Sequence, residues 1–139
     1  MSEMNDIKTI RAMAEQGFSQ GQLRLGLMYF AGQGGVPKDE AKAAEWFYKA
    51  AMQGEARAQF YMGLLHSGGQ GVALDNTKAA EWFNKAANQG DADAQYELAL
   101  LYTKGQGVPE DGDKAFELIN KAAANGSEAA KKLLTKMKE

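Results

Sequence analysis

The clearest alternation of apolar and polar positions lies in residues 75–88. Its apolar members recur at steps of three and four residues, and they are Ala79, Ala80, Trp82, Phe83, Ala86 and Ala87. An α-helix returns to the same face every 3.6 residues or so, roughly the average of these steps. The apolar residues therefore form one broad stripe, with the polar residues opposite. We predict an amphipathic helix over Asp75 to Asn88.

The same arrangement returns along the chain at a fixed interval. An Ala-x-x-Gly segment ends four times, at Gly17, Gly54, Gly90 and Gly126. The intervals are 37, 36 and 36 residues, and Trp46 and Trp82 keep the same register. A period of this length is typical of solenoids, in which each unit buries its apolar face against its neighbours. The pattern predicts three units, at about residues 17–53, 54–89 and 90–125.

Signals for helix ends divide each unit into two helices. Aspartates that can cap a helix N-terminus precede the second helix of each unit, at Asp39, Asp75 and Asp111. A glycine follows each of these helices, where a left-handed residue lets the chain reverse. The first helices, at about residues 19–30, 55–66 and 91–102, should pack back antiparallel. Small residues within them allow a neighbouring helix to approach closely, at Gly26, Gly63 and Ala99.

The two ends of the chain predict single capping helices, at about residues 4–16 and 127–138. The latter carries four lysines that we expect to be exposed, namely Lys131, Lys132, Lys136 and Lys138. The expected fold is all-α, a right-handed α–α superhelix of three 36-residue helix pairs flanked by single helices. It forms one domain over residues 1–139 without a strand. We expect the core between the helices to contain Trp46 and Trp82 in equivalent buried positions, together with Phe47 and Phe83.

The motif in the second unit resembles that of a known family. Residues 58–63 read Ala-Gln-Phe-Tyr-Met-Gly, and they are followed by Gly-x-Gly-Val, an aspartate and Lys-Ala-Ala-Glu-Trp-Phe-x-Lys-Ala-Ala-x-x-Gly. This pattern resembles the Sel-one-like repeat (SLR), a helix-pair solenoid related to tetratricopeptide repeats. The resemblance covers about residues 14–126 and implies a protein-binding function. Four positions depart from the usual tyrosine, proline, glycine and tryptophan, namely His66, Ala73, Ala99 and Leu118, and these changes affect packing only.

Composition narrows the classes of partner. The chain has 16 lysines and arginines against 18 aspartates and glutamates, a net charge of −2, which does not favour nucleic acid. No uncharged stretch is apolar enough to cross a bilayer, so we expect no membrane insertion. Residues 1–6 lack the basic and apolar segments of a signal peptide, and we therefore expect a cytoplasmic protein. A periplasmic or secreted chain whose signal peptide has been removed would show the same pattern.

Residues with catalytic or metal-binding chemistry are few. The chain has no cysteine and one histidine, His66, with no local spacing of carboxylates that would complete a metal site. The glycine-rich loops follow helices rather than strands and lack Gly-Lys-Ser or Gly-Lys-Thr, which favours connectors over phosphate sites. No serine begins a Ser-x-x-Lys motif. We expect neither an enzyme nor a bound cofactor.

The resemblance implies that the first helices line a concave face on which a partner binds. Aligning Met62-Gly63 with the leucine-glycine pair of tetratricopeptide repeats assigns to this face Gln20, Arg24, Leu27, Phe30, Arg57, Phe60, Tyr61, Leu64, Asp93, Tyr96, Glu97 and Leu100. Their charge would change from basic in the first two units to acidic in the third, which suits a peptide or protein loop. The alternative is that Leu23, Phe60 and Tyr96 are buried between helices.

We interpret the chain as a non-enzymatic interaction module, an adaptor or scaffold that acts as a monomer and binds another protein or peptide. An alternative is an immunity protein that neutralises a cognate secreted bacterial effector. A third hypothesis is a hydrolase, because some cysteine-rich SLR proteins have been linked to β-lactam binding or hydrolysis. It would require a cleft with converging ionisable groups of perturbed pKa.

Overall fold

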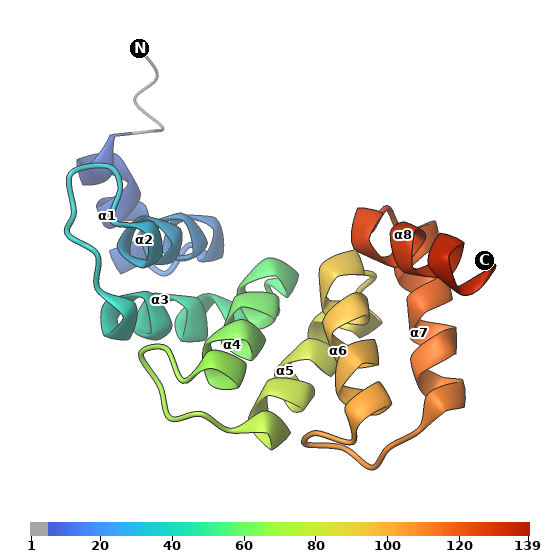
Figure 1. The fold of residues 1–139 in the computed structure, drawn as a ribbon. Helices are drawn as coiled ribbons and strands as arrows, with labels where there is room; N and C mark the ends of the chain where they lie inside the picture. The colour runs from blue at the N-terminus through green and yellow to red at the C-terminus, as the bar shows by residue number, and fades with distance from the viewer. Residues whose placement is uncertain (1–5) are drawn as a thin grey trace.

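A computed structural model describes residues 6–139, which form eight α-helices and no strand. The helices are α1 (Ile7–Glu15), α2 (Ser19–Ala31), α3 (Glu40–Met52), α4 (Ala56–Gly68), α5 (Asn76–Asn88), α6 (Ala92–Lys104), α7 (Gly112–Ala124) and α8 (Glu128–Met137). They follow one another along an arc, with α1 and α8 at opposite ends (Figure 1). The prediction of three helix pairs flanked by single helices is confirmed. The predicted start of the first helix at residue 4 lies outside the described residues.

The expected capping residues begin and end the helices. The carboxylates of Asp39, Asp75 and Asp111 each accept the backbone N–H three residues later, at 3.0 Å. Each bond satisfies one of the amides that a helix leaves free in its first turn. At the reversal between α3 and α4, Gly54 has φ +95°, a conformation that an L side chain rarely adopts. These caps place the first helix of each unit antiparallel to its second.

The small residues of the first helices allow close packing, as predicted. A Cβ atom on Gly63 would lie 2.5 Å from ring carbons of Phe83, and one on Gly26 would lie 2.6 Å from the ring of Phe47. Both aromatic rings can therefore press directly against the backbone of the helix with which they pair. In the third unit the position of Gly63 is held by Ala99, and both Ala99 and Ile119 lie in the same buried cluster.

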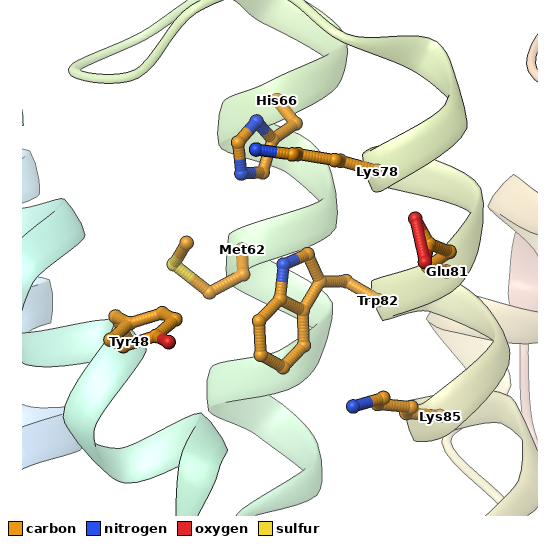
Figure 2. Close-up of a pocket in the computed structure, with 7 residues that line it drawn as sticks. All are labelled: Tyr48, Met62, His66, Lys78, Glu81, Trp82 and Lys85. Atoms are coloured by element: carbon orange, nitrogen blue, oxygen red, sulfur yellow. The ribbon is translucent and has the colours of Figure 1, made fainter.

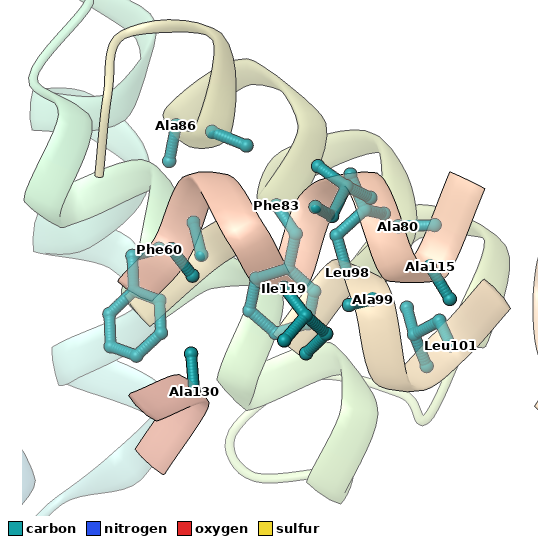
Figure 3. Packing of buried hydrophobic residues seen from close by; sticks show 14 of the residues in the cluster. Phe60, Ala80, Phe83, Ala86, Leu98, Ala99, Leu101, Ala115, Ile119 and Ala130 are labelled. Atoms are coloured by element: carbon teal, nitrogen blue, oxygen red, sulfur yellow. The ribbon is translucent and has the colours of Figure 1, made fainter. Parts of the chain in front are cut away.

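The predicted burial of the two tryptophans is wrong. Trp46 and Trp82 are only half-buried. Figure 2 shows Trp82 on the side of α5 that faces α4, beside a pocket. The buried positions belong to the next residue, since Phe47 is 0% and Phe83 1% exposed. Figure 3 shows Phe83 packed among buried residues of α6 and α7.

A repeated set of side-chain amides joins neighbouring helices. The buried Gln59 donates from Nε2 to the carbonyl oxygen of Ala51 on α3, at 3.2 Å. Its own Oε1 accepts from Nε2 of Gln89, at 2.9 Å, and the same nitrogen of Gln89 donates to the carbonyl of Gly54. The same bonds surround Gln22 in the first unit. In the third unit, Gln95 donates to the carbonyl of Ala87 and accepts from Nδ2 of Asn125. These amides fix each first helix to the ends of the second helices on both sides.

Candidate protein-interaction surface

The helices α2, α4 and α6 lie next to one another on one side of the stack. Helix α4 contacts α6 directly, and the rings of Phe30 on α2 and Tyr61 on α4 are 6.5 Å apart. We call the surface on these helices the inner face, and we define it by Arg24, Leu27, Phe30, Tyr61, Leu64, Tyr96, Glu97 and Leu100. All eight residues are half-buried. Side chains predicted from sequence therefore lie on the first helices of three consecutive units and are partly accessible.

Two of the residues that could lie on this face are buried. Leu23 is 8% exposed and Phe60 is 7% exposed, so both serve mainly the packing between helices. The ring of Phe60 lies 6.0 Å from that of Phe83, and the guanidinium of Arg57 lies over it at 4.5 Å. Tyr96 at the equivalent position is half-buried and belongs to the inner face. The alternative of burial is thus confirmed for Leu23 and Phe60.

An aromatic group joins the first two units on the inner face. The ring of Tyr61 stacks on that of Phe47, with 5.0 Å between centroids and 11° between planes. Phe30 also lies near Phe47, at 6.4 Å. Offset stacking of this kind holds rings in defined orientations. The exposed parts of Phe30 and Tyr61 are therefore presented on a rigid support.

The expected change from basic to acidic along this face needs correction at Arg57. Its guanidinium forms a salt bridge with Asp91 at 2.9 Å and another with Asp93 at 3.1 Å. The side chain of Asp91 is 4% exposed and also caps α6. Arg57 therefore joins the second unit to the third. Gln20 has the equivalent role one unit earlier, since its Nε2 donates to Glu55 at 2.6 Å.

Two titratable groups next to this face are perturbed. Burial lowers the pKa of Arg57, but the hydrogen bond and attraction to Asp91 outweigh it, and the pKa is raised overall. Burial raises the pKa of Glu97, the repulsion of Asp93 raises it further, and Lys104 acts in the opposite direction. Glu97 thus retains an electrostatic penalty when ionised, and a cation placed beside it would relieve this penalty.

The first unit adds a shallow hollow beside the inner face. It has a volume of about 260 Å³, and its lining includes Ile10, Arg24, Leu27 and Met28. Arg24 occupies the position that Tyr61 occupies in the second unit, and Ile10 the position of Phe47. The aromatic stack of the second unit has no counterpart here. The apolar surface of α2 therefore continues toward α1.

The described residues contain no group of three or more His, Cys, Asp or Glu side chains that could hold a metal ion. His66 is buried, and its Nδ1 lies 3.2 Å from the carbonyl oxygen of Ala73, to which it donates. Of the helices in residues 6–139, none has the length and apolarity that a bilayer span requires. The accessible chemistry of the inner face is that of aromatic, aliphatic and charged side chains, which suits protein contacts.

The sequence pattern and the helix pairs define a helix-pair solenoid. The Sel1 repeat family model matches residues 19–55, 56–91 and 92–127, and the chain belongs to this family. Sel1 repeats serve as protein-interaction modules, and their fold is generally non-catalytic.

Similar proteins come from bacteria and plants. A Sel1 repeat protein from Oxalobacter formigenes is 37% identical with a TM-score of 0.81, over 91% of this chain and 95% of that one. A protective antigen of uropathogenic Escherichia coli with an SLR fold is 34% identical with a TM-score of 0.85, over 90% of this chain and 27% of that one. A plant relative, the ERAD-associated E3 ubiquitin-protein ligase component HRD3A of Arabidopsis thaliana, is 36% identical over 67 residues, 48% of this chain and 10% of that protein.

Proposed function

We propose that this chain is an adaptor or scaffold that binds a protein or peptide on its inner face. The observation that carries the proposal is the set of half-buried apolar side chains on three adjacent helices, from Leu27 and Phe30 through Tyr61 and Leu64 to Leu100. Partly exposed aromatic and aliphatic anchors on a rigid support contribute most of the energy of many interfaces. The name of the plant relative, a component of a ligase, agrees with a role in multiprotein assemblies.

The inner face also favours a partner with a basic residue near the third unit. Glu97 is half-buried beside Asp93, and its pKa is raised by burial and by that neighbour. A lysine or arginine of the partner would restore favourable electrostatics to Glu97, and close charge pairs increase both on-rate and specificity. Apolar contacts on α2 and α4 with a cation at α6 would then fix the direction in which a peptide binds.

The test combines capture of partners with substitutions on the inner face. The tagged chain is incubated with a lysate of the source organism, bound proteins are identified by mass spectrometry, and the affinity of the purified partner is measured by calorimetry. Changing Leu64 and Leu100 together to serine should weaken binding more than tenfold, because two apolar anchors are lost.

The matched control removes an exposed leucine away from this face. Leu74, in the loop between α4 and α5, is 63% exposed, and Leu74→Ser should leave the affinity unchanged. If the control weakens binding and the double variant does not, the inner face is not the binding surface. Recovery of a secreted toxin as the partner would favour an immunity protein over a scaffold.

A further inference from the structure

A second concave surface lies between α3 and α5, where α4 forms its floor. One hollow of about 410 Å³ and another of about 280 Å³ share three lining residues, Tyr48, Met62 and His66. Figure 2 shows Trp82 and Lys78 extending from α5 toward α4, with Lys85 below Trp82, and Tyr48 on α3 opposite them. We call this combined space the α3–α5 hollow. None of the residues that define the inner face lines it.

A smaller counterpart of the 410 Å³ hollow lies between α5 and α6, where the second unit meets the third. A hollow of about 190 Å³ is lined by residues that each lie 36 positions after a residue of the larger hollow. Half of the lining is conserved in type, and the pairs that differ are Ala41 and Thr77, Tyr48 and Asn84, Met62 and Leu98, and His66 and Tyr102. The difference in volume therefore arises from residues that the repeat itself does not require.

His66 is one of the four residues that differ between the two hollows. The equivalent residues in the other two units are tyrosines, and each of their rings lies beneath a lysine, Lys42 at 5.4 Å from Tyr29 and Lys114 at 5.6 Å from Tyr102. An imidazole is shorter than a phenol, and the Nδ1 of His66 is directed to the carbonyl of Ala73. Lys78 extends across the smaller imidazole of His66 (Figure 2), where its counterparts lie over a tyrosine ring.

The hollow combines an apolar centre with two cationic ends. The centre consists of Met62, the indole of Trp82 and the ring of Tyr48, which meet edge to face at 6.1 Å. Tyr48 is 48% exposed. Lys78 and Lys85 lie on either side of Trp82 along α5 (Figure 2), and the Nζ of Lys85 lies over the indole at 4.9 Å from its centroid. In the part of the chain that the structure describes neither lysine forms an ion pair.

We propose that the α3–α5 hollow binds an acidic segment of a partner protein in which one large apolar side chain lies between two carboxylates. The apolar side chain fills the space over Met62 between Tyr48 and Trp82, and the carboxylates pair with Lys78 and Lys85. The exposed carboxylates of Glu45 and Glu81 also line the hollow, and they disfavour a third acidic group over its centre. This site is independent of binding on the inner face.

The spacing of the lysines fixes the spacing of the acidic residues. Lys78 and Lys85 are seven residues apart on α5, which corresponds to about 10.5 Å along the helix axis. In an extended peptide, side chains two residues apart lie on the same face, about 6.6 Å from each other. A Glu-x-Leu-x-Glu segment therefore presents its three side chains on one face over about 13 Å. The flexible lysine arms accommodate the difference from 10.5 Å.

The test uses the full chain and the capped peptide acetyl-Glu-Ala-Leu-Ala-Glu-amide. In a ¹⁵N NMR titration, the indole N–H signal of Trp82 should shift saturably and that of Trp46 should not, with the two assigned through Trp46→Phe. The same peptide with glutamine in place of both glutamates should bind at least tenfold more weakly, because the lysines lose their counter-charges. If the signal shows no saturable shift with up to about 5 mM peptide, the affinity is too weak for specific recognition, and the proposal would be overturned.

Two variants place the binding in this hollow. His66→Tyr introduces the residue that the other units contain, so it should fold normally and reduce affinity at least tenfold by filling the space. Lys78→Gln with Lys85→Gln changes only exposed positions, and it should reduce affinity to a similar extent. The matched control is Lys42→Gln with Lys114→Gln, which should bind as the unmodified chain does. Equal affinity of the lysine variant and its control would show that the peptide binds elsewhere. The inner-face variant Leu64→Ser with Leu100→Ser should still bind the peptide.

Discussion

Gly63 shows how strongly a single residue can determine the packing of a repeat. Its backbone lies against the ring of Phe83, and even a methyl group would come within 2.5 Å of that ring. Ala99 stands at the same place in the third unit, where the residue corresponding to Phe83 is Ile119. In each pair, the smaller the residue on the first helix, the larger the side chain that can pack against it from the second helix.

Gly63→Ala should lower the free energy of unfolding by about 1–3 kcal/mol, because the added methyl group overpacks the contact with Phe83. Urea unfolding followed by circular dichroism measures this change. Adding Phe83→Ile to the same chain reproduces the pair of the third unit and should recover part of the loss. If the two substitutions are simply additive, the contact is not the cause of the destabilisation.

The raised pKa of Glu97 predicts that the stability of the chain depends on pH. Burial raises the pKa of its carboxyl group above the ordinary value, and Asp93 adds to this. The folded chain therefore holds the proton to a higher pH than the unfolded chain does, and stability is lost as the pH rises through the raised pKa. Glu97→Gln removes the charge, so it should be more stable than the unmodified chain at about pH 7.

The same comparison at about pH 3 should show a much smaller difference, because the carboxyl group is then largely protonated in both states. Urea unfolding at the two pH values tests the sign. Glu110→Gln in an exposed loop is the matched control, since it removes a carboxylate that is not buried. A lower stability of Glu97→Gln at neutral pH would contradict the explanation based on burial.

The sequence predicted an aromatic core in the first two units but not which aromatic residue fills it. Trp82 and Phe83 are adjacent, and the apolar stripe of α5 is wide enough to include both. The ring that is buried is the one that packs against Gly63. Because Gly63 lies on α4 and both rings lie on α5, the sequence of α5 alone does not show which ring this is. Arg57 was assigned to the binding face for a similar reason. Its partner Asp91 lies 34 residues away, and no local pattern indicates the pair.

At the scale of helices, the amide groups were the main feature that sequence reasoning missed. A signal was present, because Gln22, Gln59 and Gln95 keep the repeat register within otherwise apolar helices. Buried polar side chains require hydrogen-bond partners, and their recurrence indicates that the partners recur as well. Those partners are backbone carbonyls and amides at the ends of neighbouring helices. They could be identified only once the helices had been placed.

Gln59→Leu should therefore destabilise the chain by about 1–3 kcal/mol, although it keeps a similar volume. The substitution removes two hydrogen bonds, one to the carbonyl of Ala51 and one from the amide of Gln89, and each such bond contributes about 0.5–1.5 kcal/mol. The carbonyl of Ala51 keeps its bond from the Gly54 N–H, and the amide of Gln89 keeps its bond to the carbonyl of Gly54. Thermal or urea unfolding measures the loss. Gln106→Leu, at an exposed loop position, provides the comparison and should stay within about 0.5 kcal/mol of the unmodified chain.

For the whole molecule, the number of neighbours that a helix has should determine its local stability. The end helices α1 and α8 each pack mainly on a single helix, whereas α4 and α5 have neighbours on both sides. In repeat proteins, stability is the sum of contributions from units and from their interfaces. Amide hydrogen exchange should therefore be fastest in α1 and α8 and slowest in α4 and α5. Uniform protection along the chain would show instead that it opens only as one unit.

The 36-residue spacing has a consequence for the length of the molecule. Gln53 and Gln89 hold equivalent places at the ends of α3 and α5, and a glycine follows each of them. A second copy of residues 54–89 inserted after Gln89 would therefore meet the same backbone and amide partners on both sides. Arg57 of the first copy would face Glu55 of the second, at the position where it now meets Asp91. The arc can thus be extended in whole steps, and each step adds another inner surface and another α3–α5 hollow at a fixed interval.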